Sequence, residues 1–268
     1  MQKEFIIGGK MLKIRKYLIE NISLSFLDFS KDIKEISKKD YLNEQVKDIF
    51  IDFNIGSILL SSSMKNELDE VSFSLYNLDY IKEMIIYIRK EKDSLLYSSN
   101  ISFNNKKLSS PYLVGNTLFN SKNYSSTTKV RSRNIESALN KFILDSIQSK
   151  SFIRLFNNKG IYVSIIGNNK SKVYNQISTC DKASLFSNSE ILDNEIFSSY
   201  EKKLISQQEI KNKCICSYEK CIDIVSSLIK DKKDDVFNKE KKIELTCPIC
   251  GKKYIIKEKD ILNQQVSS

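Results

Sequence analysis

The spacing of apolar residues along the chain predicts two amphipathic helices. Apolar positions recur every three to four residues over residues 41–65 and again over residues 134–149, which is the period of one helical face. The first stripe contains Leu42, Val46, Ile49, Phe50 and Phe53 and resumes at Ile58 and Leu59; the second contains Ile135, Leu139, Phe142, Ile143 and Ile147. We expect both stripes to face a hydrophobic core.

Around these helices the apolar pattern changes to a period of two, which is typical of strands with one buried face. Residues 69–77 show it, and residues 83–100, 110–130 and 152–167 each indicate two strands joined by a turn. The predicted turn residues are Gly115 and residues 120–123 in the second case, and Asn157, Asn158 and Gly160 in the third. This mixed order, without regular βαβ alternation, predicts an N-terminal α+β domain with an antiparallel sheet over residues 1–167.

The apolar pattern weakens over residues 168–210, where Ser, Asn and Lys are frequent and apolar runs are short. We expect a loosely packed helical linker there. The character changes again at Cys214, so we expect a small separate C-terminal domain over residues 211–268.

Composition narrows the class of protein. Apolar residues make up 41% of the 268 positions, enough for a packed core. The longest uninterrupted apolar run, Met84 to Ile88, is far shorter than the roughly 20 residues of a membrane helix, and the N-terminal apolar run is too short for a signal peptide. We therefore expect a soluble cytoplasmic protein with no membrane partner, in a compartment that keeps thiols reduced.

The net charge of +10 has two interpretations. It favours a nucleic-acid or acidic-membrane partner, or it reflects lysine spread through a chain rich in Lys, Ile, Asn and Ser. Because the lysines of residues 31–39 and 230–242 alternate with acids, we favour the second interpretation. The chain also contains no histidine, which excludes Ser-His-Asp and Cys-His catalysis and zinc sites with histidine ligands.

Four of the six cysteines form two close pairs, Cys214-x-Cys216 and Cys247-x-x-Cys250. Two pairs on separate turns are what a tetrahedral four-cysteine zinc site needs, whereas two unrelated pairs of buried cysteines are the alternative. Pro248 stiffens the second turn and Gly251 permits a positive φ after it, which favours one Zn²⁺ per reduced chain. Nearby cations would offset the charge of four thiolates and lower their pKa values: Lys211, Lys213, Lys220, Lys252 and Lys253.

The other two cysteines have a different context. Cys221 shares the helical spacing of Tyr218, Ile222, Val225, Leu228 and Ile229, and Ser217 precedes them as a candidate N-cap. We therefore expect Cys221 to be a core residue. Cys180, alone in the linker, is interpreted as a free thiol, with a redox role as the alternative.

The C-x-C spacing of the first pair indicates more than a structural metal site. Its sulfurs stay close after metal loss, and the disulfide they could form closes a small, strained and easily reduced ring. An easily reversed disulfide suits a site whose function is to be oxidised.

The segments "CICSYEKCIDIVSSLI" and "LTCPICGKKYIIKEKDI" resemble the C-terminal signature of the 33-kilodalton redox-regulated heat-shock chaperone family. That signature is C-x-C-S before a helix, then C-x-x-C-G and an aromatic residue. Residues 55–77, 111–119 and 145–155 are similar to the family's core elements, whereas residues 77–83 and 160–169 depart from its glycine-rich pattern.

The resemblance implies a holdase rather than an enzyme. Cys214, Cys216, Cys247 and Cys250 would bind zinc in the reduced, inactive state. Peroxide or hypochlorous acid would then form the disulfides Cys214–Cys216 and Cys247–Cys250, and zinc would leave. The linker would lose structure and expose apolar surface to unfolding client proteins, with a homodimer as the oxidised form.

Two other functions have support in the residues alone. A basic zinc ribbon that binds nucleic acid would use the net charge, although no basic and aromatic strand face stands out near the cysteines. A thiol oxidoreductase would use "CPIC", but Gly251 and "KKYII" indicate a turn leading into a strand rather than into a helix.

Overall fold

The structure is a computed structural model that describes residues 12–30, 42–62, 69–119, 122–147, 149–167, 171–188, 190–229 and 242–261. The chain divides into two compact units, Met1–Asn212 and Lys213–Ser268. The predicted lysine-rich segment at residues 31–39 lies outside the described residues, as does nearly all of the second one. No helix in the described part of the chain is long and apolar enough to cross a bilayer.

The described part of the first unit contains a mixed sheet of nine strands in the order β6-β5-β3-β4-β9-β1-β2-β8-β7. The strands are β1 Lys13–Ile19, β2 Ile22–Asp28, β3 Glu70–Lys90, β4 Ser94–Leu108, β5 Tyr112–Phe119, β6 Lys122–Lys129, β7 Ser151–Phe156, β8 Lys159–Ile165 and β9 Lys202–Asn212. Every neighbouring pair is antiparallel except β4 and β9, which are parallel. The α+β class predicted from the sequence is confirmed.

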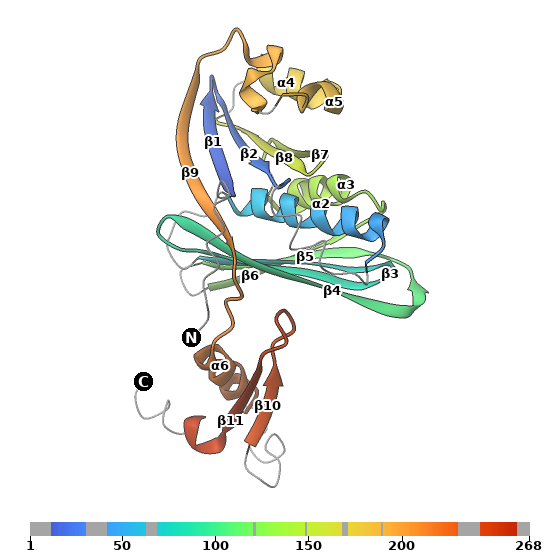
Figure 1. The fold of residues 1–268 in the computed structure, drawn as a ribbon, viewed down its shortest axis with the longest axis vertical. Coiled ribbons are helices and arrows are strands. Elements are labelled where there is room, and N and C mark those ends of the chain that lie inside the picture. The colour runs from blue at the N-terminus through green and yellow to red at the C-terminus, as the bar shows by residue number, and fades with distance from the viewer. Residues whose placement is uncertain are drawn as a thin grey trace. The chain divides into compact units, whose positions relative to one another are not determined.

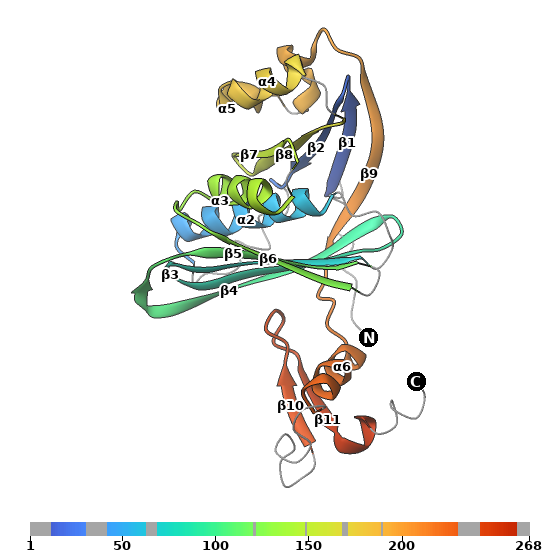
Figure 2. The same cartoon turned by 180° about the vertical axis from the view of Figure 1, so that it is seen from behind.

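Strand β9 joins the two halves of this sheet, which lie on opposite sides of a helical layer (Figure 1). Its residues 202–209 pair with β1 and its residues 209–212 pair with β4. Between the halves lie α2, Glu44–Ser61, and α3, Ile135–Phe142, which continues as the π-helical turn η1, Ile143–Ile147. The view from behind in Figure 2 shows the same arrangement.

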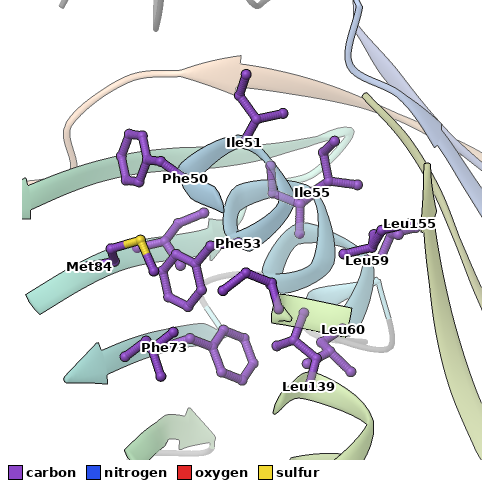
Figure 3. Close-up of a cluster of buried hydrophobic side chains, with 14 of the residues drawn as sticks. Phe50, Ile51, Phe53, Ile55, Leu59, Leu60, Phe73, Met84, Leu139 and Leu155 are labelled. Carbon is purple, nitrogen blue, oxygen red and sulfur yellow. The ribbon is translucent and has the colours of Figure 1, made fainter. Parts of the chain in front are cut away.

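The main core fills the space around α2 (Figure 3). Phe53 of α2 lies beside Met84 and Phe73 of β3, and Leu59 lies beside Leu155 of β7. The helix begins at Asn43, whose side chain accepts a hydrogen bond from the Val46 N–H at 2.9 Å. Both predicted helices are confirmed, except that Ile147 at the end of the second stripe is 42% exposed.

The three predicted hairpins are confirmed as β3–β4, β5–β6 and β7–β8. Asn157 and Asn158 have φ values of 46° and 62°, as a tight turn requires. The prediction of a turn at Gly115 was wrong, since this residue lies inside β5. A Cβ on Gly115 would lie 2.5 Å from Cζ of Phe142, so the glycine lets α3 approach the sheet.

Residues 171–200 form four short helices: α4 Lys172–Thr179, α5 Lys182–Leu185, η2 Ile191–Asp193 and η3 Glu195–Phe197. We expected loose packing here, but the structure differs, because the few apolar side chains all point to one face. That face covers the side of β1, β2, β8 and β7 turned away from α2 (Figure 1). Five of these side chains are at most 1% exposed: Val173, Ile177, Leu185, Ile191 and Phe197. The expectation of helix also fails over residues 202–210, which lie in β9, Lys202–Asn212.

Polar contacts hold this helical segment, residues 171–200, to the sheet. Arg154 of β7 donates to the carbonyls of Ile177 at 2.7 Å and Cys180 at 2.9 Å, which satisfies the C-terminal end of α4. Lys182 pairs with Glu136 of α3 at 2.6 Å. Cys180 is half-buried and burial raises the pKa of its thiol, so it stays protonated near neutral pH.

The second unit contains α6, Tyr218–Ile229, and the antiparallel pair β10, Lys242–Thr246, and β11, Lys253–Lys257. Ser217 accepts a hydrogen bond from the Lys220 N–H at 3.2 Å, so the predicted N-cap is confirmed. The core within its described residues is small and consists of Cys221, Val225, Tyr254, Ile256 and Ile261, with a few half-buried neighbours.

Asp52 of α2 provides a test of the helical layer in the first unit. Burial, with the nearby charges of Asp48 and Glu136, raises its pKa to about 6, whereas Lys182 opposes the shift. Because the folded pKa lies above the unfolded value, the ionised carboxylate costs stability at pH 7, by about 3 kcal/mol. The cost disappears as the pH falls through 6 toward 4.

Asp52→Asn should therefore stabilise the protein against urea at pH 7, and this gain should shrink at pH 5. Asp93→Asn, at an exposed turn residue, is the control and should leave the urea midpoint unchanged at both pH values. An Asp52→Asn gain that is equal at pH 7 and pH 5 would contradict the assignment.

Candidate metal centre

The second cysteine pair lies on the turn between β10 and β11. The Cys247 N–H donates to the Lys252 carbonyl at 2.9 Å and the Gly251 N–H donates to the Cys247 carbonyl at 3.0 Å. Gly251 has a φ of +72°, as predicted from its place after the second cysteine. These bonds fold the chain tightly around Cys247 and Cys250.

The first pair lies in the irregular segment that precedes α6. The structure brings its two sulfurs to those of the second pair, and the four Sγ atoms all lie within 4.8 Å of one another. The Sγ atoms of Cys214 and Cys247 are 3.7 Å apart, and those of Cys216 and Cys250 are 3.5 Å apart. Three of the four cysteines are half-buried, and Cys250 is exposed.

The geometry of this sulfur cluster fits a tetrahedral ion. Zinc–thiolate bonds are about 2.3 Å long, so the sulfurs of a regular tetrahedral site lie about 3.8 Å apart. Both sulfur–sulfur distances given above are close to that value. Thiolates are also the donors that zinc and softer ions prefer. The cluster can therefore hold a metal ion.

Without a bound metal, the thiols of the cluster differ in pKa. Burial raises the pKa of the Cys214 thiol to about 12. Burial also acts to raise the pKa of Cys216, but hydrogen bonds from Tyr254 and the other cysteines outweigh it and lower this pKa to about 7. Without a metal, Cys216 is therefore more acidic than Cys214.

Neither the contact of Tyr254 with the cluster nor the polar role of Tyr218 was predicted, since Tyr218 was expected on the apolar stripe of α6 but is 37% exposed. The Tyr254 hydroxyl donates to the Sγ atom of Cys216 at 3.0 Å. The Tyr218 hydroxyl donates to Asp260 at 2.6 Å, and Asp260 also accepts from the Lys257 N–H at 2.9 Å. The alternation of β11, in which Tyr254 and Ile256 are buried, was a signal that could have placed Tyr254 on the side of the cysteines.

Three of the predicted lysines have partners other than the cysteines. Lys253 pairs with Glu244 at 2.6 Å and Lys211 with Glu209 at 3.5 Å. Lys252 places its Nζ atom 4.9 Å from the ring centroid of Tyr254.

Cys221 does not belong to the sulfur cluster. It is 9% exposed on the inner face of α6, beside Val225 in the small core, and burial raises the pKa of its thiol. Its predicted role as a core residue is confirmed.

The first unit is thus an α+β domain, and the small second unit that follows it in the chain carries four clustered cysteines. The family model described as Hsp33 protein matches residues 15–257, and the chain belongs to the Hsp33 family.

Individual relatives support this assignment over shorter stretches. The "33 kDa chaperonin" of Prochlorococcus marinus strain MIT 9515 is 36% identical over 70 residues, and that of strain AS9601 is 34% identical over 70 residues. Each match spans 25% of this chain and 23% of the relative. The crystal structure of the 33 kDa chaperonin from Thermotoga maritima has the same fold, with a TM-score of 0.64 and 17% identity over 97% of this chain and 100% of that one.

Two Cys→Ser substitutions test which cysteines bind the metal. Cys247→Ser removes one of the four clustered sulfurs, so we expect bound zinc to fall well below one ion per chain. Cys221→Ser places a hydroxyl in an apolar core and should cost about 1–3 kcal/mol of stability, yet keep one zinc. Zinc is measured with a chromophoric chelator after thiol modification. Loss of zinc in Cys221→Ser would overturn its assignment to the core.

Proposed function

We propose that this protein is a redox-regulated holdase. In the reduced state Cys214, Cys216, Cys247 and Cys250 bind one zinc ion, and the protein is inactive. After oxidation it binds unfolding client proteins, as a homodimer, in the cytoplasm and without catalytic turnover. The convergence of four sulfurs in a unit with very little apolar core is the observation that carries this proposal.

The second unit needs a metal to be stable. Two five-residue strands and one helix bury few side chains, and such small units seldom fold on hydrophobic burial alone. Zinc contributes about 10 kcal/mol or more of folding free energy in modules of this size. Oxidation of the thiolates removes the ligands and therefore removes that contribution.

The oxidised pairs that we propose are Cys214–Cys216 and Cys247–Cys250. In the folded unit the short sulfur–sulfur distances run between the two pairs. Once the unit unfolds, the members of one pair remain separated by one or two residues, whereas residues 217–246 separate the pairs. Closing the shorter loop costs less conformational entropy, which supports disulfides within each pair.

Strand β9 offers a route from the metal centre to the helical segment at residues 171–200. It ends at Asn212, two residues before Cys214, and Ile210 is its one buried side chain. Backbone hydrogen bonds to β1 and β4 therefore hold most of β9 in place. We propose that release of its C-terminal end lets β9 separate from the sheet.

Separation of β9 would also free the helical segment that precedes it. That segment covers Ile19, Ile22, Leu24, Ile161 and Val163, all 0% exposed. Its departure would expose two apolar faces, one on the sheet and one on the segment itself. Such a surface can bind unfolding proteins, because their own apolar side chains are exposed.

A basic zinc ribbon that binds nucleic acid is the second candidate, since the net charge is +10. The family assignment favours the holdase. Salt-dependent RNA binding by the zinc-loaded form, with no gain of client binding on oxidation, would favour the ribbon instead.

Metal removal should affect the two units differently. We expect a chelator that strips zinc from the reduced protein to abolish amide protection in α6, β10 and β11, while β3 and α2 keep theirs because their core is large. Hydrogen exchange with mass spectrometry measures both regions in one experiment. Full protection of α6 and β11 without metal would contradict a metal-dependent fold.

Activity should follow oxidation reversibly. The reduced protein should carry one zinc per chain and fail to suppress aggregation of a thermally unfolding client. Hydrogen peroxide at elevated temperature should release zinc and start suppression, and dithiothreitol should reverse it. The Cys221→Ser variant, which keeps all four proposed ligands, is the control and should still release zinc and start suppression on oxidation. If the reduced protein is equally active, or zinc stays bound after oxidation, the switch is absent.

A further inference from the structure

Tyr254 is held rigidly with its hydroxyl directed at the sulfur cluster. The residue is 6% exposed, and its ring belongs to the small core with Val225 and Ile256. Its backbone pairs with Leu245 in the β10–β11 ladder. The packing of the ring therefore fixes the position of the hydroxyl, which donates the 3.0 Å hydrogen bond to the Sγ atom of Cys216.

The chemistry of the two groups sets the direction of this hydrogen bond. A thiolate only accepts, so the phenol must donate when Cys216 is ionised or bound to a metal. Donation to a charged sulfur is stronger than donation to a neutral one. Lys252 lies over the Tyr254 ring, and a cation there draws electron density from the ring and strengthens the O–H donor.

Cys216 differs from Cys214 and Cys250 in the kind of donor that contacts its sulfur. The sulfurs of Cys214 and Cys250 interact with the backbone N–H groups of Cys216 and Lys252, which no side-chain substitution removes. Besides the other cysteines, Cys216 has a side-chain donor, the Tyr254 hydroxyl, which a substitution can remove.

We propose that Tyr254 is a positioning residue of the redox switch. Its hydroxyl holds the Cys216 sulfur in the metal-binding arrangement and withdraws charge from it, which slows attack of that sulfur on peroxide. This inference rests on the proposed function, because it concerns the oxidation of the same cluster. Outer-shell hydrogen bonds of this kind commonly change metal affinity by about 10- to 100-fold.

The oxidation that Tyr254 restrains uses peroxide as the oxidant and balances as two electrons. The Cys216 sulfur attacks one peroxide oxygen, a S–O bond forms, the O–O bond breaks and hydroxide leaves. A second thiolate, from Cys214, then attacks the sulfenic sulfur. The S–S bond forms, the S–O bond breaks, and the departing hydroxide takes up a proton to become water. Two thiolates are oxidised and one peroxide is reduced.

Tyr254→Phe in the full-length, zinc-loaded protein tests this role, because the substitution keeps the buried ring and removes only the hydroxyl. Tyr218→Phe is the matched control, since it removes a hydroxyl in the same unit that binds Asp260 instead of a sulfur. Zinc release under peroxide is followed with a chromophoric chelator, zinc affinity by chelator competition, and the site of first oxidation by cysteine alkylation and mass spectrometry.

We expect Tyr254→Phe to release zinc roughly three to ten times faster than the unaltered protein, with Cys216 oxidised first. Its zinc dissociation constant should rise about tenfold, and the sulfur-to-metal charge-transfer band of the cobalt(II) form should shift to lower energy. Tyr218→Phe should leave the band in place and release zinc at the unaltered rate.

Equal release rates in Tyr254→Phe and the unaltered protein would overturn the inference. So would equal acceleration in Tyr218→Phe, because general loosening of the unit would then explain both. These results are separate from the proposed function. A protein that releases zinc on oxidation but gains no client binding would refute the holdase. The zinc release rate of Tyr254→Phe would still test the role of Tyr254 in that case.

Discussion

The arrangement of the second unit depends on bringing four cysteine sulfurs within 4.8 Å of one another. Four thiolates at such distances repel one another, and a divalent cation is the simplest way to hold them together. The core within its described residues is too small to do this by hydrophobic burial. We therefore propose that metal binding and folding are coupled in this unit, so that oxidation of the sulfurs would also unfold it.

The first unit has the opposite character. Two separate apolar clusters lie on either side of the β1-β2-β8-β7 half of its sheet, and the cluster around α2 needs no metal. The helical segment at residues 171–200 closes the second cluster, and β9 connects that segment to Cys214. Strand β9 buries only Ile210 and is otherwise held by backbone hydrogen bonds to β1 and β4. Under the proposed function, oxidation of the small unit would release this strand and segment while the core around α2 stays folded.

Local patterns predicted much of this structure. The helix at residues 44–61, the turn at Asn157 and Asn158, the N-cap Ser217 and the buried Cys221 each follow from periodicity or from the chemistry of one residue. The four clustered cysteines were likewise predicted from their spacing.

What the sequence missed depends on tertiary contacts. Gly115 was assigned to a turn because glycine usually marks one, whereas here it makes room for Phe142. Strand β9 has no clear alternation, because its side chains are mostly exposed and its partners β1 and β4 are distant in sequence. The contact between Tyr254 and Cys216 spans 38 residues, and no local pattern specifies it.

Native mass spectrometry of the reduced chain during a peroxide titration tests the central claim most directly, since it reports zinc and disulfides in the same molecule. The account predicts direct conversion of a species with one zinc and free thiols into a zinc-free species with two disulfides. Digestion should then locate these as Cys214–Cys216 and Cys247–Cys250. A populated species that has both disulfides and still retains zinc would contradict the account.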